Sequence, residues 1–239
     1  MTRPGALVGR RAVDLQGGTQ LNHAAIVSPR RGRPGSAARQ CPVRFYFDFI
    51  SPFGYFASLR IDALAARHGR EVSWHPMLLG VSVLKVMGLK PLLSTPLKGD
   101  YIRRDIARYV RRHGIVMQRQ PDDLFMDPRA SGRAFCWTAA HHPALARPLA
   151  QAILHRYWAE GADLSTPASV AALAPPGLGA GELRAAIEGD ESGRLLRGAV
   201  EASLAAGVFG SPTVAADGEL FWGVDSFAVL EDWLATGGW

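Results

Sequence analysis

The chain has 239 residues, of which 48% are apolar, 20% charged and 9% aromatic, a composition typical of a globular protein with one or two domains. It contains no apolar run approaching the roughly 18 residues of a membrane-spanning helix, and no apolar segment that ends in a small-residue secretory cleavage site. The net charge of +6 arises in residues 1–42, which hold seven of the 27 basic and one of the 21 acidic residues, so we expect the neutral remainder to have no bulk attraction for nucleic acid.

Residues 1–42 are rich in Arg, Gly, Ser and Pro and have weak apolar periodicity. We predict a basic, disordered extension, or residues upstream of the natural start. An organelle transit peptide and an arm that touches RNA or membrane are the alternatives. Cys41 and Cys136 form neither a CxxC motif nor a zinc ligand set, so the sequence predicts no metal site.

Ordered structure is predicted from Val43. Apolar and polar residues alternate over 43–49, which predicts a strand. Ser51 and Pro52 follow, a favoured helix cap and a favoured first helical residue, and an apolar stripe over 53–65 predicts one helix. Residues 71–75 form a second predicted strand. Two strands joined by a helix favour a parallel β-α-β crossover.

Between residues 77 and 193 helical periodicity prevails and no convincing strand is found, which predicts an all-helical insertion. A helix through 195–204 then leads to two short β-prone runs around Asp217-Gly218, a strong hairpin signal, and to a final helix that starts near Asp225 or Ser226. Because neither end has enough strands to be stable alone, residues 43–76 and 194–239 are predicted to share one sheet in an α/β domain.

Three turns could carry chemistry. A hydroxyl at Ser51, at the start of a helix, could donate to an anion, or Ser51 could be a helix cap alone. The peptide bond before Pro212 could be cis and turn the backbone of Ser211 towards a cleft, or Pro212 could simply start a strand. Asp225 could cap the last helix or could receive an ammonium group.

Taken together, the motifs resemble the 2-hydroxychromene-2-carboxylate isomerases, which belong to the thioredoxin-like superfamily with DsbA and the kappa-class glutathione transferases. The resemblance covers about residues 43–239. It rests on Phe-Tyr-Phe-Asp-Phe-Ile-Ser-Pro-Phe-Gly-Tyr (45–55), Thr-Pro-Leu-Lys-Gly-Asp-Tyr (95–101), Gly-Val-Phe-Gly-Ser-Pro-Thr (207–213) and Phe-Trp-Gly-Val-Asp (221–225). It implies a thioredoxin-like domain with an inserted all-helical domain.

The resemblance also implies a glutathione site. Redox relatives carry CxxC at positions 51–54, where this chain has no cysteine, and isomerase relatives use a serine at position 51 to bind the sulfur of glutathione. The backbone of Ser211, beside Pro212, falls where the cysteinyl part is held, so that its side chain should matter little. The γ-glutamyl end is implied for the segment of Trp222, Gly223, Val224 and Asp225, although Ser226 replaces the usual Arg.

On the substrate side, the resemblance implies Lys85, Leu89 and Lys98 around an aromatic carboxylate, and ordinary solvated surface charges are the alternative for the two lysines. Residues 118–127 would face the substrate, although this stretch departs from the family pattern. Glutathione thiolate would add to an electrophilic carbon, permit rotation about the former double bond and then leave. A kappa-class-like transferase, which would release a conjugate, and a non-catalytic thioredoxin-like binding module are the alternatives. A cytoplasmic homodimer is expected, because reduced glutathione is cytoplasmic and relatives with this insertion commonly form dimers.

Overall fold

The computed structural model of the chain describes residues 42–239. The prediction for the basic N-terminal extension therefore lies, except for its last residue, outside the described part. Across residues 42–239, every helix is too short or too polar to cross a bilayer.

A four-stranded mixed sheet joins the two ends of the described chain, as the sequence predicted. Its strands are β1 (Val43–Phe47), β2 (Val72–Pro76), β3 (Thr213–Ala216) and β4 (Glu219–Trp222), in the order β2-β1-β3-β4. β1 pairs with β2 in parallel and with β3 antiparallel, and β3 and β4 form the predicted hairpin. Its turn residues Asp217 and Gly218 have φ angles of 53° and 95°, the left-handed backbone that an Asp-Gly turn favours.

The crossover between β1 and β2 holds two helices, α1 (Pro52–Ser58) and α2 (Ile61–Arg67), so the prediction of one helix was wrong. The Ser58 hydroxyl donates to the Tyr55 carbonyl over 2.7 Å, at the point where α1 ends. A hydroxyl that takes a helix carbonyl competes with the next backbone N–H, which explains the break. The apolar stripe runs on because both helices turn the same face to the core.

The middle of the chain is helical, and the structure shows no strand between β2 and β3. The elements in this part are η2 (Gly80–Val86, π-helical), η3 (Leu92–Ser94, a 3-10 turn), α3 (Lys98–His113), α4 (Arg129–His141), α5 (Pro143–Leu154), η4 (His155–Ala159, π-helical), α6 (Pro167–Ala171), α7 (Ala180–Glu188) and α8 (Asp190–Ala205). The chain ends in η5 (Val224–Ser226, a 3-10 turn) and α9 (Phe227–Thr236). The predicted domain boundary at residues 193–194 falls inside α8, so this helix belongs to both parts.

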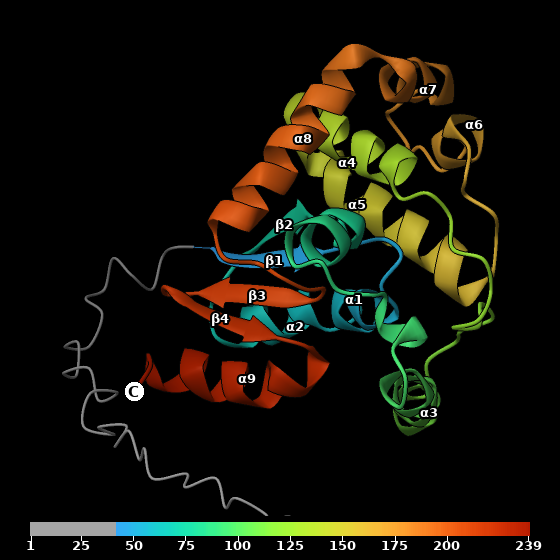
Figure 1. Cartoon of the computed structure of the whole chain (residues 1–239). Helices are drawn as coiled ribbons and strands as arrows, with labels where there is room; N and C mark the ends of the chain where they lie inside the picture. Colours follow the sequence, from blue (N-terminus) through green and yellow to red (C-terminus); the bar gives the residue numbers. More distant parts are fainter. Residues whose placement is uncertain (1–41) are drawn as a thin grey trace, which may run out of the picture. The chain divides into compact units, whose positions relative to one another are not determined.

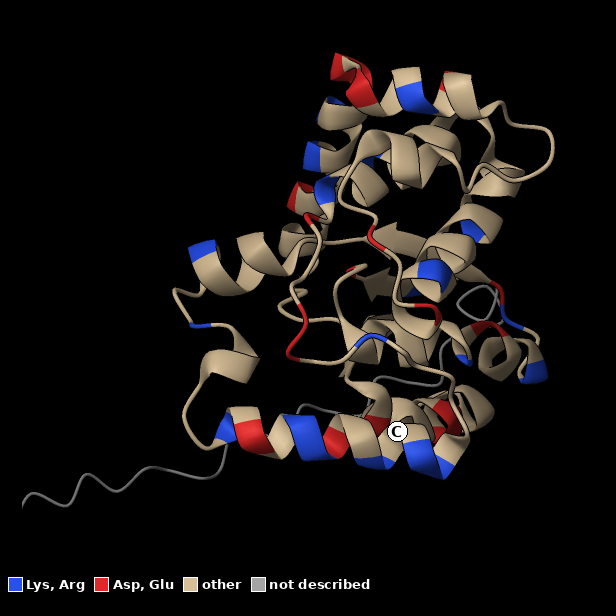
Figure 2. Ribbon diagram, turned by 90° about the vertical axis from the view of Figure 1, so that its right-hand side faces the viewer, with Lys and Arg blue, Asp and Glu red and all other residues tan. Residues whose placement is uncertain are grey.

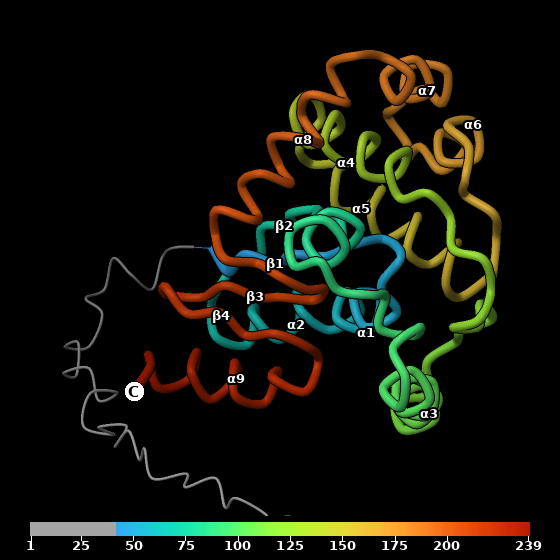
Figure 3. Tube along the Cα trace, in the orientation of Figure 1, coloured from blue at the N-terminus to red at the C-terminus, as the bar shows by residue number. Residues whose placement is uncertain are grey.

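Helices α4 to α8 gather on one side of the described part, at the top of Figure 1, while α9 lies on the opposite side against β4. Both α4 and α8 contact β2, and the rings of Phe135 and Phe47 pack edge to face with the centroids 5.6 Å apart. One continuous apolar core therefore links the sheet to the helical group. The tube in Figure 3 shows the chain leaving β2 through η2 to α3, which stands apart at the lower right.

Candidate functional site

Ser51 lies between β1 and α1, and its hydroxyl has two partners. Its Oγ accepts a hydrogen bond from the backbone N–H of Gly54 over 3.0 Å, which makes Ser51 the cap of α1. The same hydroxyl donates to the carbonyl oxygen of Ser211, also over 3.0 Å. Ser51 is thus a cap and also a link to the turn before β3. Of the two roles that the sequence analysis weighed, the helix cap is present, and donation to an anion stays a prediction.

The Ser211–Pro212 peptide bond is cis, and Ser211 takes part through its side chain as well as its backbone. The Ser211 Oγ accepts from the backbone N–H of Asp48 over 2.9 Å. The side chain of Ser211 thus has a structural role, since an apolar side chain at position 211 could not accept that bond, while the expectation that it matters little for the ligand stays a prediction. The Pro212 carbonyl accepts from the N–H of Gly223 over 2.9 Å, which joins this turn to the end of β4.

Asp48 joins Ser51, Ser211 and Pro212 in one hydrogen-bonded cluster, called the Ser51 group below. The sequence analysis did not single Asp48 out. Its carboxyl is fully buried and accepts from the N–H of Leu79 over 2.7 Å and from the N–H of Ile50 over 3.2 Å. Burial raises the pKa of the Asp48 carboxyl to about 6, and the backbone hydrogen bonds oppose that rise. Asp48 therefore ties the turn of Ser51 to the start of the segment that leads into η2.

The residues at the end of β4 and after it differ in their exposure to solvent. Trp222 is 56% exposed, and its ring packs against Phe209 with 5.1 Å between centroids, whereas Val224 is buried in the core and can meet a ligand only through its backbone. Asp225 is exposed and, among residues 42–239, forms no hydrogen bond or ion pair. It does not cap α9, because Ser226 holds the cap position and Asp225 lies in η5.

The predicted substrate residues lie on the segment between β2 and α3. Lys85 is on η2, Leu89 follows η2, and Lys98 is the first residue of α3; all three are exposed. Within the described part neither lysine side chain has a hydrogen bond or ion pair, so both ammonium groups could bind an anion. The structure does not connect these three residues to Ser51 by any hydrogen bond. The start of their segment is tied to the site by the hydrogen bond from the backbone N–H of Leu79 to the Asp48 carboxylate.

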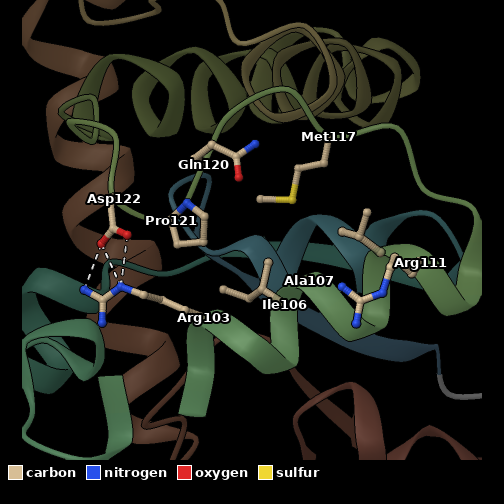
Figure 4. Close-up of a pocket in the computed structure, with 9 residues that line it drawn as sticks. Arg103, Ile106, Ala107, Arg111, Met117, Gln120, Pro121 and Asp122 are labelled. Carbon is tan, nitrogen blue, oxygen red and sulfur yellow. Dashed lines mark hydrogen bonds and ion pairs between the residues drawn. The ribbon is translucent and has the colours of Figure 1, made fainter. Parts of the chain in front are cut away.

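A cavity of about 480 Å³ lies between α3 and residues 117–122, and Figure 4 shows its lining. Ile106, Ala107 and Met117 give it an apolar floor, while Arg103 is held at one end by Asp122 over 2.8 Å. Residues 120–122 belong to the stretch that the resemblance placed on the substrate side. None of the residues of the Ser51 group lines this cavity.

Cys136 lies on α4, away from positions 51–54. It is buried, and burial raises the pKa of its thiol to about 12, so it is not a ready nucleophile. In the described residues there is no cluster of three or more His, Cys, Asp or Glu side chains placed to hold a metal ion.

The parallel β-α-β unit, the antiparallel hairpin and the cis-proline beside a helix start define a thioredoxin-like fold. Residues 42–235 match the sequence profile of the family described as DSBA-like thioredoxin domain. The chain belongs to this family.

Two curated relatives are 2-hydroxychromene-2-carboxylate isomerases. The chain is 26% identical over 198 residues to the protein from Sphingobium xenophagum, an alignment that covers 80% of this chain and 97% of the relative. It is 28% identical over 196 residues to the protein from Pseudomonas putida, covering 79% and 92%. A solved structure of a 2-hydroxychromene-2-carboxylate isomerase matches with a TM-score of 0.68 and 25% identity, covering 82% of this chain and 95% of that one.

Proposed function

We propose that this protein is a glutathione-dependent isomerase of the 2-hydroxychromene-2-carboxylate type. The names of the relatives, which align over nearly their whole length, support isomerase function. The single observation that carries the glutathione part is the Ser51 hydroxyl, which is buried at the start of α1 and points to the Ser211 carbonyl beside Pro212. Positions 51–54 hold no cysteine, so a sulfur that reacts there must come from a ligand.

The donors and acceptors of this group fit glutathione. Bound glutathione supplies a thiolate, which can add reversibly to an electrophilic double bond. The Ser51 hydroxyl can turn from the Ser211 carbonyl towards a sulfur and stabilise its negative charge, which lowers the pKa of a thiol. The Ser211 carbonyl can then accept from a peptide N–H of the ligand, so that no buried acceptor loses its partner. The seven-residue α1 contributes little dipole, so the hydroxyl is the main donor.

We place the acidic aromatic substrate on the side of Lys85, Leu89 and Lys98, where the two unpaired ammonium groups can attract its carboxylate and an exposed leucine can meet its ring. A requirement for reduced glutathione assigns the protein to the cytoplasm. A homodimer remains part of the proposal.

Ser51→Ala tests the role of the hydroxyl. We expect the pKa of the glutathione thiol in the complex, followed by the ultraviolet absorbance of the thiolate, to rise, and isomerase turnover to fall about 100-fold, as when one preorganised donor is removed. Loss of the cap should also lower the free energy of unfolding by about 1 kcal/mol, so the assays belong well below the unfolding temperature.

Ser58→Ala is the matched control. Ser58 lies on the same helix, is buried, and donates to the Tyr55 carbonyl without touching the Ser51 group. Its loss should leave the pKa of the bound thiol and the turnover unchanged. If Ser51→Ala leaves both quantities at the wild-type value, Ser51 does not act on the sulfur. Mass analysis of the products separates an isomerase from a transferase that releases a conjugate.

A further inference from the structure

The peptide group that joins Phe49 to Ile50, in the turn that leads to Ser51, is hydrogen-bonded through both of its polar atoms. The indole N–H of Trp158 donates to the Phe49 carbonyl over 2.9 Å. The N–H of the same peptide group, which belongs to Ile50, donates to the Asp48 carboxylate over 3.2 Å. Ser51 closes the turn, because its own N–H donates to the Asp48 carbonyl over 3.1 Å. The backbone that carries the Ser51 hydroxyl is therefore fixed at the ends of the turn and in its middle.

Trp158 holds this carbonyl from a fixed position. It lies in the π-helical η4, is fully buried, and packs edge to face with Tyr157 at 5.1 Å between centroids. η4 contacts α1, the helix that the turn begins. A ring that is packed on all sides keeps its N–H in one direction, and within residues 42–239 the indole N–H is the one donor to the Phe49 carbonyl.

η4 also holds the stretch of residues 118–127, which the resemblance placed on the substrate side. The Trp158 carbonyl accepts from the N–H groups of Gln118 and Arg119 over 3.0 and 3.2 Å. Lys and Arg are frequent along α3, at the bottom of Figure 2, but Arg119 lies in the loop after α3 and is buried. Its guanidinium lies 4.1 Å from the centroid of the Tyr157 ring and donates to the Tyr157 carbonyl over 3.2 Å. η4 therefore links this loop to the turn before α1.

The direction of the Ser51 hydroxyl depends on that turn. A buried carbonyl that loses its donor stays unsatisfied unless water enters or the backbone shifts to another donor. Such a shift would move Ser51, whose hydroxyl makes two directed bonds of 3.0 Å, from the N–H of Gly54 and to the carbonyl of Ser211. A displaced donor stabilises a developing charge less well, because this effect requires preorganised geometry.

We propose that Trp158 is a positioning residue for Ser51, whose indole N–H holds the Phe49 carbonyl and thereby directs the Ser51 hydroxyl at the sulfur of the ligand. The inference rests on the proposed function, under which that sulfur belongs to glutathione. Trp158 is fully buried, so it acts through the turn and not by contact with the ligand.

Trp158→Phe tests the proposal, because phenylalanine keeps a buried ring and removes the N–H. We expect the pKa of the glutathione thiol in the complex to rise and isomerase turnover to fall about 10-fold, less than after loss of the Ser51 hydroxyl itself. The KM for the aromatic substrate should change little, because the backbone carbonyl at position 158 still holds residues 118–127.

Trp74→Phe is the matched control, because it makes the same change in the same core. Trp74, on β2, is buried, and its indole N–H donates to Asp62 of α2 over 3.2 Å instead of to the turn before α1. Both variants should lower the midpoint of urea unfolding. Trp74→Phe should leave the pKa of the bound thiol and the turnover unchanged.

Two further measurements separate positioning from a general loosening of the core. In Ser51→Ala/Trp158→Phe the change at position 158 should have no further effect on the pKa of the bound thiol, because the hydroxyl that it directs is gone. Amide hydrogen exchange gives a readout without glutathione. The Ser51 and Gly54 amides should exchange about 10-fold faster in Trp158→Phe, as after loss of one hydrogen bond, and at the wild-type rate in Trp74→Phe.

The inference is overturned if Trp158→Phe leaves the pKa of the bound thiol unchanged while Ser51→Ala raises it. It is also overturned if the two effects add in the double variant, or if Trp74→Phe raises the pKa as much as Trp158→Phe. A wild type that binds no glutathione, or a Ser51→Ala variant that leaves the thiol unchanged, overturns the proposed function and this inference with it. A response to Ser51→Ala without a response to Trp158→Phe overturns this inference alone.

Discussion

Asp48 shows what a single residue contributes and why the sequence hides it. Strict alternation over residues 43–49 placed Asp48 on the polar face of a strand, together with Arg44 and Tyr46. In the structure Arg44 is exposed and Tyr46 is buried, because the sheet is covered on both faces, while β1 ends at Phe47 and Asp48 is buried in the turn that follows it. Alternation predicts a half-exposed strand, and it fails where a sheet is covered on both sides.

The buried carboxyl predicts a pH dependence of stability. An Asp with an ordinary pKa near 3.9 when unfolded and about 6 when folded binds its proton more tightly in the native state. The free energy of unfolding should therefore fall as pH rises from about 4 to about 6, by ~3 kcal/mol from this group alone. Denaturant unfolding across this range measures the slope.

Asp48→Asn removes the titrating group and should remove this part of the slope. It should also lower stability overall by about 1–3 kcal/mol, because an amide offers one acceptor oxygen where two backbone N–H groups need partners. Equal slopes in the variant and the wild type would show that Asp48 does not titrate in this range.

At the scale of elements, the local signals predicted regular segments well and their interruptions poorly. The Asp217-Gly218 turn and the Ser51-Pro52 helix start lie where predicted, because each depends on the backbone preference of the residues themselves. The break between α1 and α2 could not be seen, since an apolar stripe does not report which carbonyl a serine hydroxyl takes. The π-helical η2 also has no apolar periodicity in the sequence that distinguishes it from an α-helix or a loop.

Gly54 shows how closely α1 packs against the turn before Pro212. A Cβ on Gly54 would lie 2.8 Å from the Ser211 Oγ, 3.1 Å from the Ser51 Cβ and 3.2 Å from the Asp48 carbonyl oxygen. Gly54→Ala should therefore destabilise the protein by ~1–3 kcal/mol, despite the better helix propensity of alanine, and weaken glutathione binding.

Gly198, inside α8, is the control, because a Cβ there would meet nothing within 4 Å. Gly198→Ala should stabilise the protein by ~0.5–1 kcal/mol and leave glutathione binding unchanged. Urea unfolding of both variants gives the two free energies. A stabilising Gly54→Ala would mean that α1 can move away from the Ser211 turn.

At the scale of the whole molecule, the prediction that both ends share one sheet was confirmed. The sequence was sufficient for this prediction, because each end of the chain has too few strands to form a stable sheet alone. The grouping of Arg60, Arg112 and Asp225 around a cavity of about 270 Å³ between α3 and η5 could not be predicted in this way. Asp225 could be singled out on the sequence as a possible partner of an ammonium group, but Arg60 and Arg112 look like ordinary solvated charges, and only the packing of α3 beside η5 brings the three together.

A buried ion pair links the two halves of the sheet. Arg70, before β2, meets Asp217 in the hairpin turn with nitrogen–oxygen distances of 2.8 and 3.1 Å, and both side chains are 6% exposed. Arg70→Met leaves the Asp217 carboxylate buried without its partner and should lower the free energy of unfolding by ~3–5 kcal/mol.

Arg70→Met/Asp217→Asn removes both charges and should be more stable than Arg70→Met alone. Asparagine also tolerates the left-handed backbone at position 217. Denaturant unfolding of the single and double variants completes the cycle, and additive losses would contradict a coupled pair.

The burial of Cys136 has a consequence for an enzyme that handles electrophiles. Alkylation of a cysteine requires the thiolate, and a thiol with a pKa of about 12 inside the helical layer almost never forms it at neutral pH. An electrophilic substrate should therefore not alkylate the protein at this position, and under the proposed function the only thiol in its path would be that of a replaceable tripeptide.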